Sequence, residues 1–293
     1  MALPAIAPYP MPSAAELPPN RVAWAADPSR AALLIHDMQN HFLNAFRRDE
    51  QPVPQLLANI ARLREACAAQ GVPVFFSAQP GGQSLAQRGL LQDFWGGGIA
   101  AGEQPQRIVD ELHPRPGETH LTKWRYSAFQ RTDLLAQLRA QGRDQLIICG
   151  IYAHIGCLMT ACEAFMSDIQ PFFVADAVAD FTPEDHQMAI AYAARRCAVV
   201  ATTDAVLATL APAPAAEALS LEGLRQAIAD LLDESPAKIG DDDNLMYLGL
   251  DSIRLMTLME QWRRAGVEIS FIELAERPTL AGFWSLISAQ ATA

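Results

Sequence analysis

Between residues 31 and 204, short apolar runs alternate with longer amphipathic segments, and this alternation constrains the fold more than any other feature. Continuous apolar runs predict strands that are buried on both faces, as in parallel sheets covered by helices. We therefore predict an α/β domain with a three-layer arrangement. The expected strands are 31–36, 72–78, 118–123, 146–151, 172–177 and 198–202, and the expected helices are 54–70, 132–141, 157–169 and 183–196.

The alternating pattern ends at residues 210–216, which are rich in alanine and proline. Such a composition predicts a semi-rigid linker. Beyond it, apolar residues recur at helical spacing in four segments, with a long polar loop between the first two; the segments are 220–234, 252–266, 271–276 and 279–288. We therefore predict a large α/β domain at 1–209, a linker at 210–216 and a small all-α bundle at 217–293.

The charge of the chain is concentrated in the predicted bundle. Residues 217–293 hold thirteen acidic and six basic side chains, a net charge of −7 out of −11 for all 293 residues. An acidic module repels nucleic acid and anionic membranes and attracts basic protein surfaces. We therefore expect protein partners, with neither nucleic acid nor membrane among them.

The cysteines and the N-terminus bear on location. Five cysteines are present without C-x-x-C spacing, which favours neither a disulfide framework nor a zinc site. The N-terminal stretch 1–19 lacks the basic region and the long apolar run of a signal peptide. We therefore expect a cytoplasmic protein.

A short motif near the C-terminus, Leu248-Gly249-Leu250-Asp251-Ser252, places a serine at the start of a predicted helix. Serine and aspartate are common helix caps, and this is the simplest explanation of the motif. A serine at this position can also carry a phosphodiester, because unpaired N–H groups and the helix dipole stabilise an anion there. Both roles are compatible with the motif alone.

Three polar features follow predicted strands of the large domain, and the carboxyl ends of parallel strands meet at one edge of a sheet. Asp37 ends the first strand, and its carboxylate could act as an acid or base or cap the next turn. Lys123, one of only two lysines in the chain, ends the third strand. The segment 149–157 runs from a strand through a tight turn into a helix. We predict that these three features form one site.

Together these elements resemble the isochorismatase-like hydrolase superfamily, whose active site combines an aspartate, a lysine and a residue at this turn. In its cysteine amidohydrolases the third residue is a nucleophilic cysteine, at the position that aligns with Gly156. Cys157 comes one residue later, and a helical rotation of about 100° predicts that it faces away and packs. The resemblance to the isochorismatases implies enol-ether hydrolysis, with Asp37 as the general acid and Lys123 as its partner.

The same resemblance implies a set of residues that hold the two carboxylates of isochorismate and line its pocket. The carboxylate partners would be Gln79, Arg88, Tyr152 and the backbone N–H of Gly156, and the apolar wall would include Phe42, Phe94 and Trp95.

His36 is predicted to be a structural residue and not a catalytic one. Neighbouring strand residues face opposite ways, so His36 should point away from Asp37. We find no histidine with an acidic residue at a convincing metal spacing, and the Asp-x-His metal motif of nicotinamidases is missing, so no metal is predicted.

The segment after the linker resembles an acyl or peptidyl carrier domain, in which the serine of L-G-x-D-S bears 4′-phosphopantetheine. The whole chain resembles the bifunctional isochorismatase/aryl carrier proteins of catechol siderophore biosynthesis. This implies hydrolysis of isochorismate to 2,3-dihydro-2,3-dihydroxybenzoate and pyruvate, and transport of activated 2,3-dihydroxybenzoate on Ser252 for nonribosomal peptide synthesis. The implied partners are a phosphopantetheinyl transferase, an aryl-activating adenylation enzyme, a condensation domain and a second copy of the chain.

Two other functions remain open on the sequence. The hydrolase domain could be silent, leaving a carrier scaffold, or the protein could be an amidohydrolase that uses Cys157.

Overall fold

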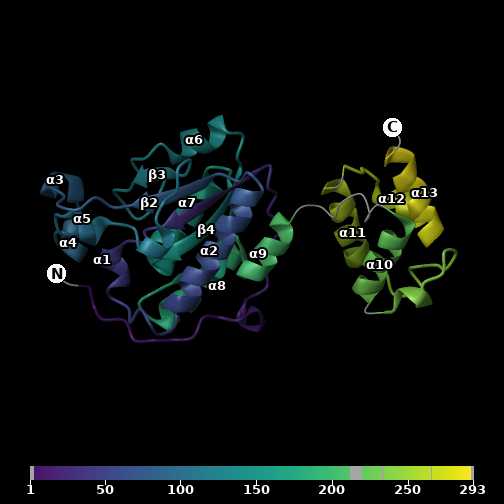
Figure 1. The fold of residues 1–293 in the computed structure, drawn as a ribbon, viewed down its shortest axis with the longest axis horizontal. Helices are drawn as coiled ribbons and strands as arrows, with labels where there is room; N and C mark the ends of the chain where they lie inside the picture. Colours follow the sequence, from purple (N-terminus) through teal and green to yellow (C-terminus); the bar gives the residue numbers. More distant parts are fainter. Residues whose placement is uncertain (1–2, 212–219, 233, 265, 292–293) are drawn as a thin grey trace. The chain divides into compact units, whose positions relative to one another are not determined.

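The computed structural model describes residues 3–211, 220–232, 234–264 and 266–291 (Figure 1). The chain divides into two compact units, Met1–Ala211 and Pro212–Ala293. Helix α9 (Thr203–Leu210) includes the first residue of the predicted linker. Residues 212–216 of that linker lie outside the described residues.

The first unit is built on a six-stranded sheet with the order β3-β2-β1-β4-β5-β6, in which every pair is parallel. The strands are β1 (Ala31–His36), β2 (Val74–Ala78), β3 (Thr119–Thr122), β4 (Gln145–Ile151), β5 (Gln170–Ala179) and β6 (Val199–Ala201). The chain order reverses between β1 and β4, so the loops that follow these two strands diverge. Such a switch point forms a crevice at the carboxyl edge of the sheet.

Helices cover both faces of this sheet, which confirms the predicted three-layer α/β fold (Figure 1). Leu33 and Ile35 of β1 pack in a core on the face of the sheet that α2 and α9 cover. Ala32 and Leu34 pack in a second core on the opposite face. This division follows from the alternation of side chains along a strand. The covering helices are α2 (Val53–Ala69) and α9 on one face, and α6 (Leu134–Ala140), α7 (Leu158–Met166) and α8 (Pro183–Arg196) on the other.

Several short elements that were not predicted follow the strands at the carboxyl edge. They are α1 (Asn40–Leu43), α3 (Leu85–Arg88), α4 (Leu91–Trp95), α5 (Glu103–Gln106) and a π-helical turn (Ala153–Cys157). Each has four or five residues, which is too short for an apolar period to show in the sequence. The π-helical turn also delays the start of α7 by one residue relative to the prediction.

The second unit is a bundle of four α-helices within the described residues, as predicted. The helices are α10 (Leu221–Leu232), α11 (Ser252–Arg264), α12 (Phe271–Glu276) and α13 (Leu280–Ala291). Leu224, Leu255 and Phe283 come from three of them and are fully buried or nearly so in one apolar core. Burial of the apolar face of each helix drives the packing, because a short helix is only marginally stable on its own. Within the described parts of both units, no helix has the length and apolar character needed to cross a bilayer.

Candidate active site and carrier site

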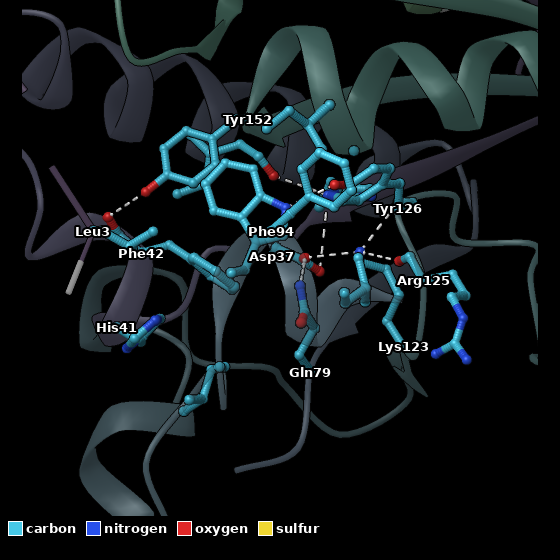
Figure 2. A pocket seen from close by; sticks show the side chains of 18 of the residues that line it. Leu3, Asp37, His41, Phe42, Gln79, Phe94, Lys123, Arg125, Tyr126 and Tyr152 are labelled. Atoms are coloured by element: carbon cyan, nitrogen blue, oxygen red, sulfur yellow. Dashed lines mark hydrogen bonds and ion pairs between the residues drawn. The ribbon is translucent and has the colours of Figure 1, made fainter. Parts of the chain in front are cut away.

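The carboxylate of Asp37 lies at the centre of the site, and both of its oxygens have partners (Figure 2). Oδ1 accepts a hydrogen bond from Ser77 Oγ at 2.7 Å, and Oδ2 accepts one from Gln79 Nε2 at 3.1 Å. Lys123 Nζ lies 3.0 Å from Oδ2. Asp37 is only 4% exposed. The strand end thus holds one carboxylate in a fixed position.

Lys123 follows β3 and meets Asp37 from the other side. Its ammonium donates to the backbone carbonyls of Arg125 and Tyr126 at 2.6 and 3.1 Å, in addition to the ion pair. The side chain is 1% exposed. A compact ammonium with three donors suits three acceptors around one point, whereas a planar guanidinium would not.

Opposing effects set the pKa of Asp37. Burial raises the pKa of this carboxyl, but the charges of Lys123 and His36 and the hydrogen bonds from Ser77 and Gln79 together outweigh it. The pKa of Asp37 therefore lies below its ordinary value, and the carboxyl is ionised at neutral pH when no substrate is bound.

The prediction that His36 points away from Asp37 is wrong. His36 Nδ1 lies 3.8 Å from Asp37 Oδ1, and the imidazole lines the same pocket. The reason is local: Asp37 has a φ of 49°, so the alternation of the strand ends at His36. A buried aspartate in the left-handed region turns its side chain out of the strand pattern.

Above the Asp37–Lys123 pair opens a pocket of about 860 Å³, open solvent at its mouth included, and six of its lining residues are Phe, Tyr or Trp. Phe181 stacks on Tyr152 with ring centroids 4.1 Å apart and on Trp95 at 6.0 Å. The Trp95 indole donates to the Tyr126 hydroxyl at 2.7 Å. The predicted wall residues Phe42, Phe94 and Trp95 all line the pocket.

Tyr152 lines the pocket, as the resemblance implied. Its hydroxyl donates to the carbonyl of Phe42 at 3.0 Å, so it already has a partner within the protein. Its ring is 7% exposed and packs edge-to-face against Phe42. Tyr152 therefore contributes its ring to the wall, and its contact with a substrate carboxylate stays a prediction.

Arg88 and Gln79 both line the pocket, as the resemblance implied. Arg88 is 4% exposed, and its Nε donates to the carbonyl of Gly96 at 2.9 Å. Gln79 donates to Asp37, and its backbone N–H donates to Gln39 Oε1 at 2.8 Å. Both side chains are thus held in place before any ligand arrives.

Gly156 lines the pocket, whereas Cys157 does not. Cys157 is fully buried in the core between the sheet and α7, which confirms its predicted packing role. Burial also raises the pKa of this thiol well above its ordinary value, which disfavours a reactive thiolate. Its burial and raised pKa argue against the amidohydrolase alternative.

Sequence reasoning missed several lining residues, among them Leu3, His41, Arg125, Tyr126 and Phe181. Arg125 and Tyr126 could have been found, because they follow Lys123 directly at the same strand end. Leu3 could not, because an N-terminal segment leaves no periodic signal that says where it docks.

Among the described residues, one group could hold a metal ion, namely His154, Asp180 and Asp185, whose ligand atoms lie within 4.8 Å of one another. Asp180 already accepts hydrogen bonds from the ring and backbone of His154 and from the backbone of Phe181. The absence of a metal thus stays a prediction.

Ser252 is the first residue of α11 and is exposed. Asp251 provides the cap, because its Oδ1 accepts the backbone N–H of Arg254 at 2.9 Å. Arg254 also donates to the carbonyl of Gly249 at 2.7 Å, and Leu250 is fully buried beneath the turn. The simple cap explanation therefore belongs to Asp251. An exposed hydroxyl at a helix N-terminus fits a covalently attached phosphodiester.

Comparison with known proteins agrees with this division. Residues 31–205 match the isochorismatase domain family, and residues 222–287 match the phosphopantetheine attachment site family. The chain is 53% identical to an isochorismatase of Bacillus subtilis (strain 168), over 98% of this chain and 96% of the relative. It is 46% identical to enterobactin synthase component B of Escherichia coli (strain K12), over 98% and 99%.

A solved isochorismatase family protein from Desulfovibrio vulgaris has a TM-score of 0.54 and 28% identity, covering 62% of this chain and 98% of its own. The fold, the family models and the long alignments agree. The chain therefore belongs to the isochorismatase family, and it joins a hydrolase domain of that family to a separate carrier domain for covalently attached phosphopantetheine.

Proposed function

We propose that the first domain hydrolyses the enol ether of isochorismate to 2,3-dihydro-2,3-dihydroxybenzoate and pyruvate. We further propose that the second carries activated 2,3-dihydroxybenzoate for nonribosomal siderophore synthesis. The observation that carries this proposal is the buried Asp37–Lys123 pair beneath an aromatic pocket, in a chain that also has a carrier domain. No described lining residue is Cys, Ser or Thr, so acid catalysis fits the pocket better than a route through a thiol or hydroxyl nucleophile of this kind.

The reaction needs a proton on the terminal CH₂ of the enol ether. Protonated Asp37 gives its proton to that carbon, and the ether carbon becomes an oxocarbenium ion. Water adds to this ion and returns a proton to the Asp37 carboxylate. The resulting hemiketal then transfers its hydroxyl proton to the ether oxygen as the C–O bond breaks, which releases pyruvate and the diol.

The low pKa of Asp37 has to be offset for this step. Isochorismate brings two carboxylates into a pocket whose described cations include Lys123, Arg88 and Arg125. Negative charge near a carboxyl raises its pKa, so a dianionic substrate counteracts Lys123 and favours proton uptake. Gln79 and Ser77 then fix the direction in which the proton is presented.

Release of pyruvate from isochorismate tests the acid. Asp37→Asn keeps the shape of the side chain but cannot supply the proton, and we expect kcat to fall by about 10³-fold. Ser285→Ala, an exposed change in the carrier domain, is the control and should leave the rate unchanged. Wild-type turnover in Asp37→Asn would refute the acid assignment, and no turnover in the wild type would favour a carrier with a silent hydrolase.

On the carrier side, we propose Ser252 as the attachment residue. When bound, phosphopantetheine supplies a thiol that holds the aryl group as a thioester. The chain's own contribution is an exposed hydroxyl, a positive helix end and the turn that Asp251 and Arg254 stabilise.

Intact-mass measurement tests this assignment. Incubation with coenzyme A and a phosphopantetheinyl transferase should add one phosphopantetheine group, and a later incubation with the adenylation enzyme, ATP and 2,3-dihydroxybenzoate should add one aryl group. Ser252→Ala should abolish both additions, and Ser285→Ala should preserve them. Continued addition to Ser252→Ala would show that another residue is modified.

The remaining proposals concern the partners of the protein and its location in the cell. We propose a phosphopantetheinyl transferase, an aryl-activating adenylation enzyme and a condensation domain as partners, and light scattering tests the proposed homodimer. A cytoplasmic site of action is supported by the five free cysteines, which fit a reducing compartment.

A further inference from the structure

The imidazole of His36 and a side chain at position 156 cannot occupy the pocket together. A Cβ added to Gly156 would lie 2.2 Å from His36 Cε1 and 2.9 Å from each ring nitrogen. The backbone of Gly156 is not in the left-handed region that favours glycine. Position 156 therefore lacks a side chain because of the histidine ring and not because of its own φ.

The ring is held firmly in this position. His36 is fully buried, and Nδ1 lies 2.9 Å from the carbonyl oxygen of Ile151. A carbonyl can only accept, so Nδ1 carries the proton and Nε2 keeps a lone pair. Nε2 has no hydrogen-bond partner among the described residues. Burial lowers the pKa of His36 to about 4, so the ring is neutral at neutral pH.

A neutral ring at this point affects Asp37 directly. Nδ1 lies 3.8 Å from Asp37 Oδ1, close enough to restrict the carboxyl group on the side away from Lys123. Because the ring is uncharged at neutral pH, it adds no second cation beside Asp37 there; its charge lowers the pKa of Asp37 only in acid, where the ring itself takes up a proton. Any side chain at 156 would displace the ring that lies beside this carboxyl.

We propose that His36 is a positioning and specificity-determining residue, whose imidazole occupies the space beside Asp37 where a side chain at position 156 would otherwise stand. The pocket is thereby kept for proton transfer and closed to a nucleophilic side chain. This inference rests on the proposed hydrolysis of isochorismate.

A double-mutant cycle on the full-length protein tests whether the His36 ring and a side chain at position 156 compete for the same space. Pyruvate release and thermal unfolding are the readouts. Gly156→Ala should lower both Tm and kcat, with kcat falling by about 100-fold, because the methyl group displaces the ring and Asp37 with it. His36→Ala should lower kcat by about tenfold with little change in KM. In the double variant the methyl group meets no ring, so Gly156→Ala should cost little further Tm.

Two comparisons separate positioning from packing. The double variant should match His36→Ala in Tm and keep a kcat about tenfold below the wild type, whereas a ring that only fills space would allow kcat to recover. His36→Asn can still donate to Ile151 and should restore kcat to within about threefold of the wild type. His113→Ala, at an exposed histidine, is the matched control and should change neither readout.

Several results would overturn the inference. Losses of Tm that simply add in the double variant would show that the two positions do not share a volume. Full recovery of kcat in the double variant, or a His36→Asn variant as slow as His36→Ala, would refute positioning. Failure of the wild type to release pyruvate would instead refute the proposed function, and the Tm cycle would still decide the steric part.

Discussion

The two sites of this chain differ most in their exposure. Asp37 is 4% exposed, and both of its oxygens have partners on neighbouring strand ends. Ser252 is exposed at the first residue of a helix, and its neighbour Asp251 makes the capping bond. A reaction on a small molecule gains from buried, fixed groups, whereas a carrier serine has to be accessible to the enzyme that attaches phosphopantetheine to it. The division into two compact units suggests that the sites can be perturbed separately.

Among the substitutions that test this difference between the two sites, Lys123→Met should have the largest effect. The substitution leaves the Asp37 carboxylate and two backbone carbonyls buried without their common partner. Breaking a buried ion pair costs about 3–5 kcal/mol, so we expect a large loss of unfolding free energy in urea and a kcat at least about 10²-fold lower.

Loading of the carrier should be unaffected in the same Lys123→Met protein, and intact mass measures this. Arg62→Met, which removes an exposed ion pair with Asp204, is the matched control and should cost well under 1 kcal/mol. If Lys123→Met prevented loading of Ser252, the two units would not be independent.

A smaller effect is expected from the aromatic wall. Phe181→Ala removes the ring that stacks on Tyr152 and Trp95. Asp37 and Lys123 keep their partners, so we expect KM for isochorismate to rise by about tenfold and kcat to change little, because lost stacking weakens binding. Tyr192→Ala, at a partly exposed aromatic residue on α8, is the control. A fall in kcat at unchanged KM would contradict this assignment.

On the carrier, the cap and the attachment residue can be told apart. Asp251→Ala removes the bond to the N–H of Arg254, and loss of a cap of this kind lowers the Tm of a small domain by about 4–8 °C. Ser252→Ala should leave Tm unchanged and abolish loading. Equal Tm losses in the two variants, seen by calorimetry, would show that Ser252 shares the capping role.

The sequence predicted those strands and helices in which the apolar pattern is long enough to be recognised. The bounds of β1 and α8 coincide with the prediction, because five apolar residues followed by a buried histidine in one case and a capped fourteen-residue helix in the other leave clear patterns. Helix α9 was missed, because eight residues give a weak period next to an alanine- and proline-rich stretch. The short helices around the pocket mouth were missed for the same reason.

For the site, chain position predicted which residues meet but not how they are oriented. Asp37 and Lys123 were found because the carboxyl ends of parallel strands converge. The orientation of His36 was wrong because one residue with positive φ ends the strand alternation, and no periodic pattern records that. The hydrogen bond from the hydroxyl of Tyr152 to the carbonyl of Phe42 was not predicted, because the two residues are 110 positions apart in the chain.

The smallest expected effect concerns pH and a second pair in the hydrolase unit. His154 Nδ1 lies 2.8 Å from Asp180 Oδ1, and this hydrogen bond raises the pKa of His154 above its ordinary value. A raised folded pKa adds stability that is complete below the unfolded pKa, near 6.5, and is lost as pH rises through the folded pKa.

The unfolding free energy of the wild type relative to His154→Asn should therefore shrink from pH 6 to pH 9. Because His154 is partly exposed, solvent screening should limit the change to well under 1 kcal/mol. Urea titrations at a series of pH values measure it, and a difference that grew with pH would mean that the neutral ring, not the charged one, is the form that Asp180 holds.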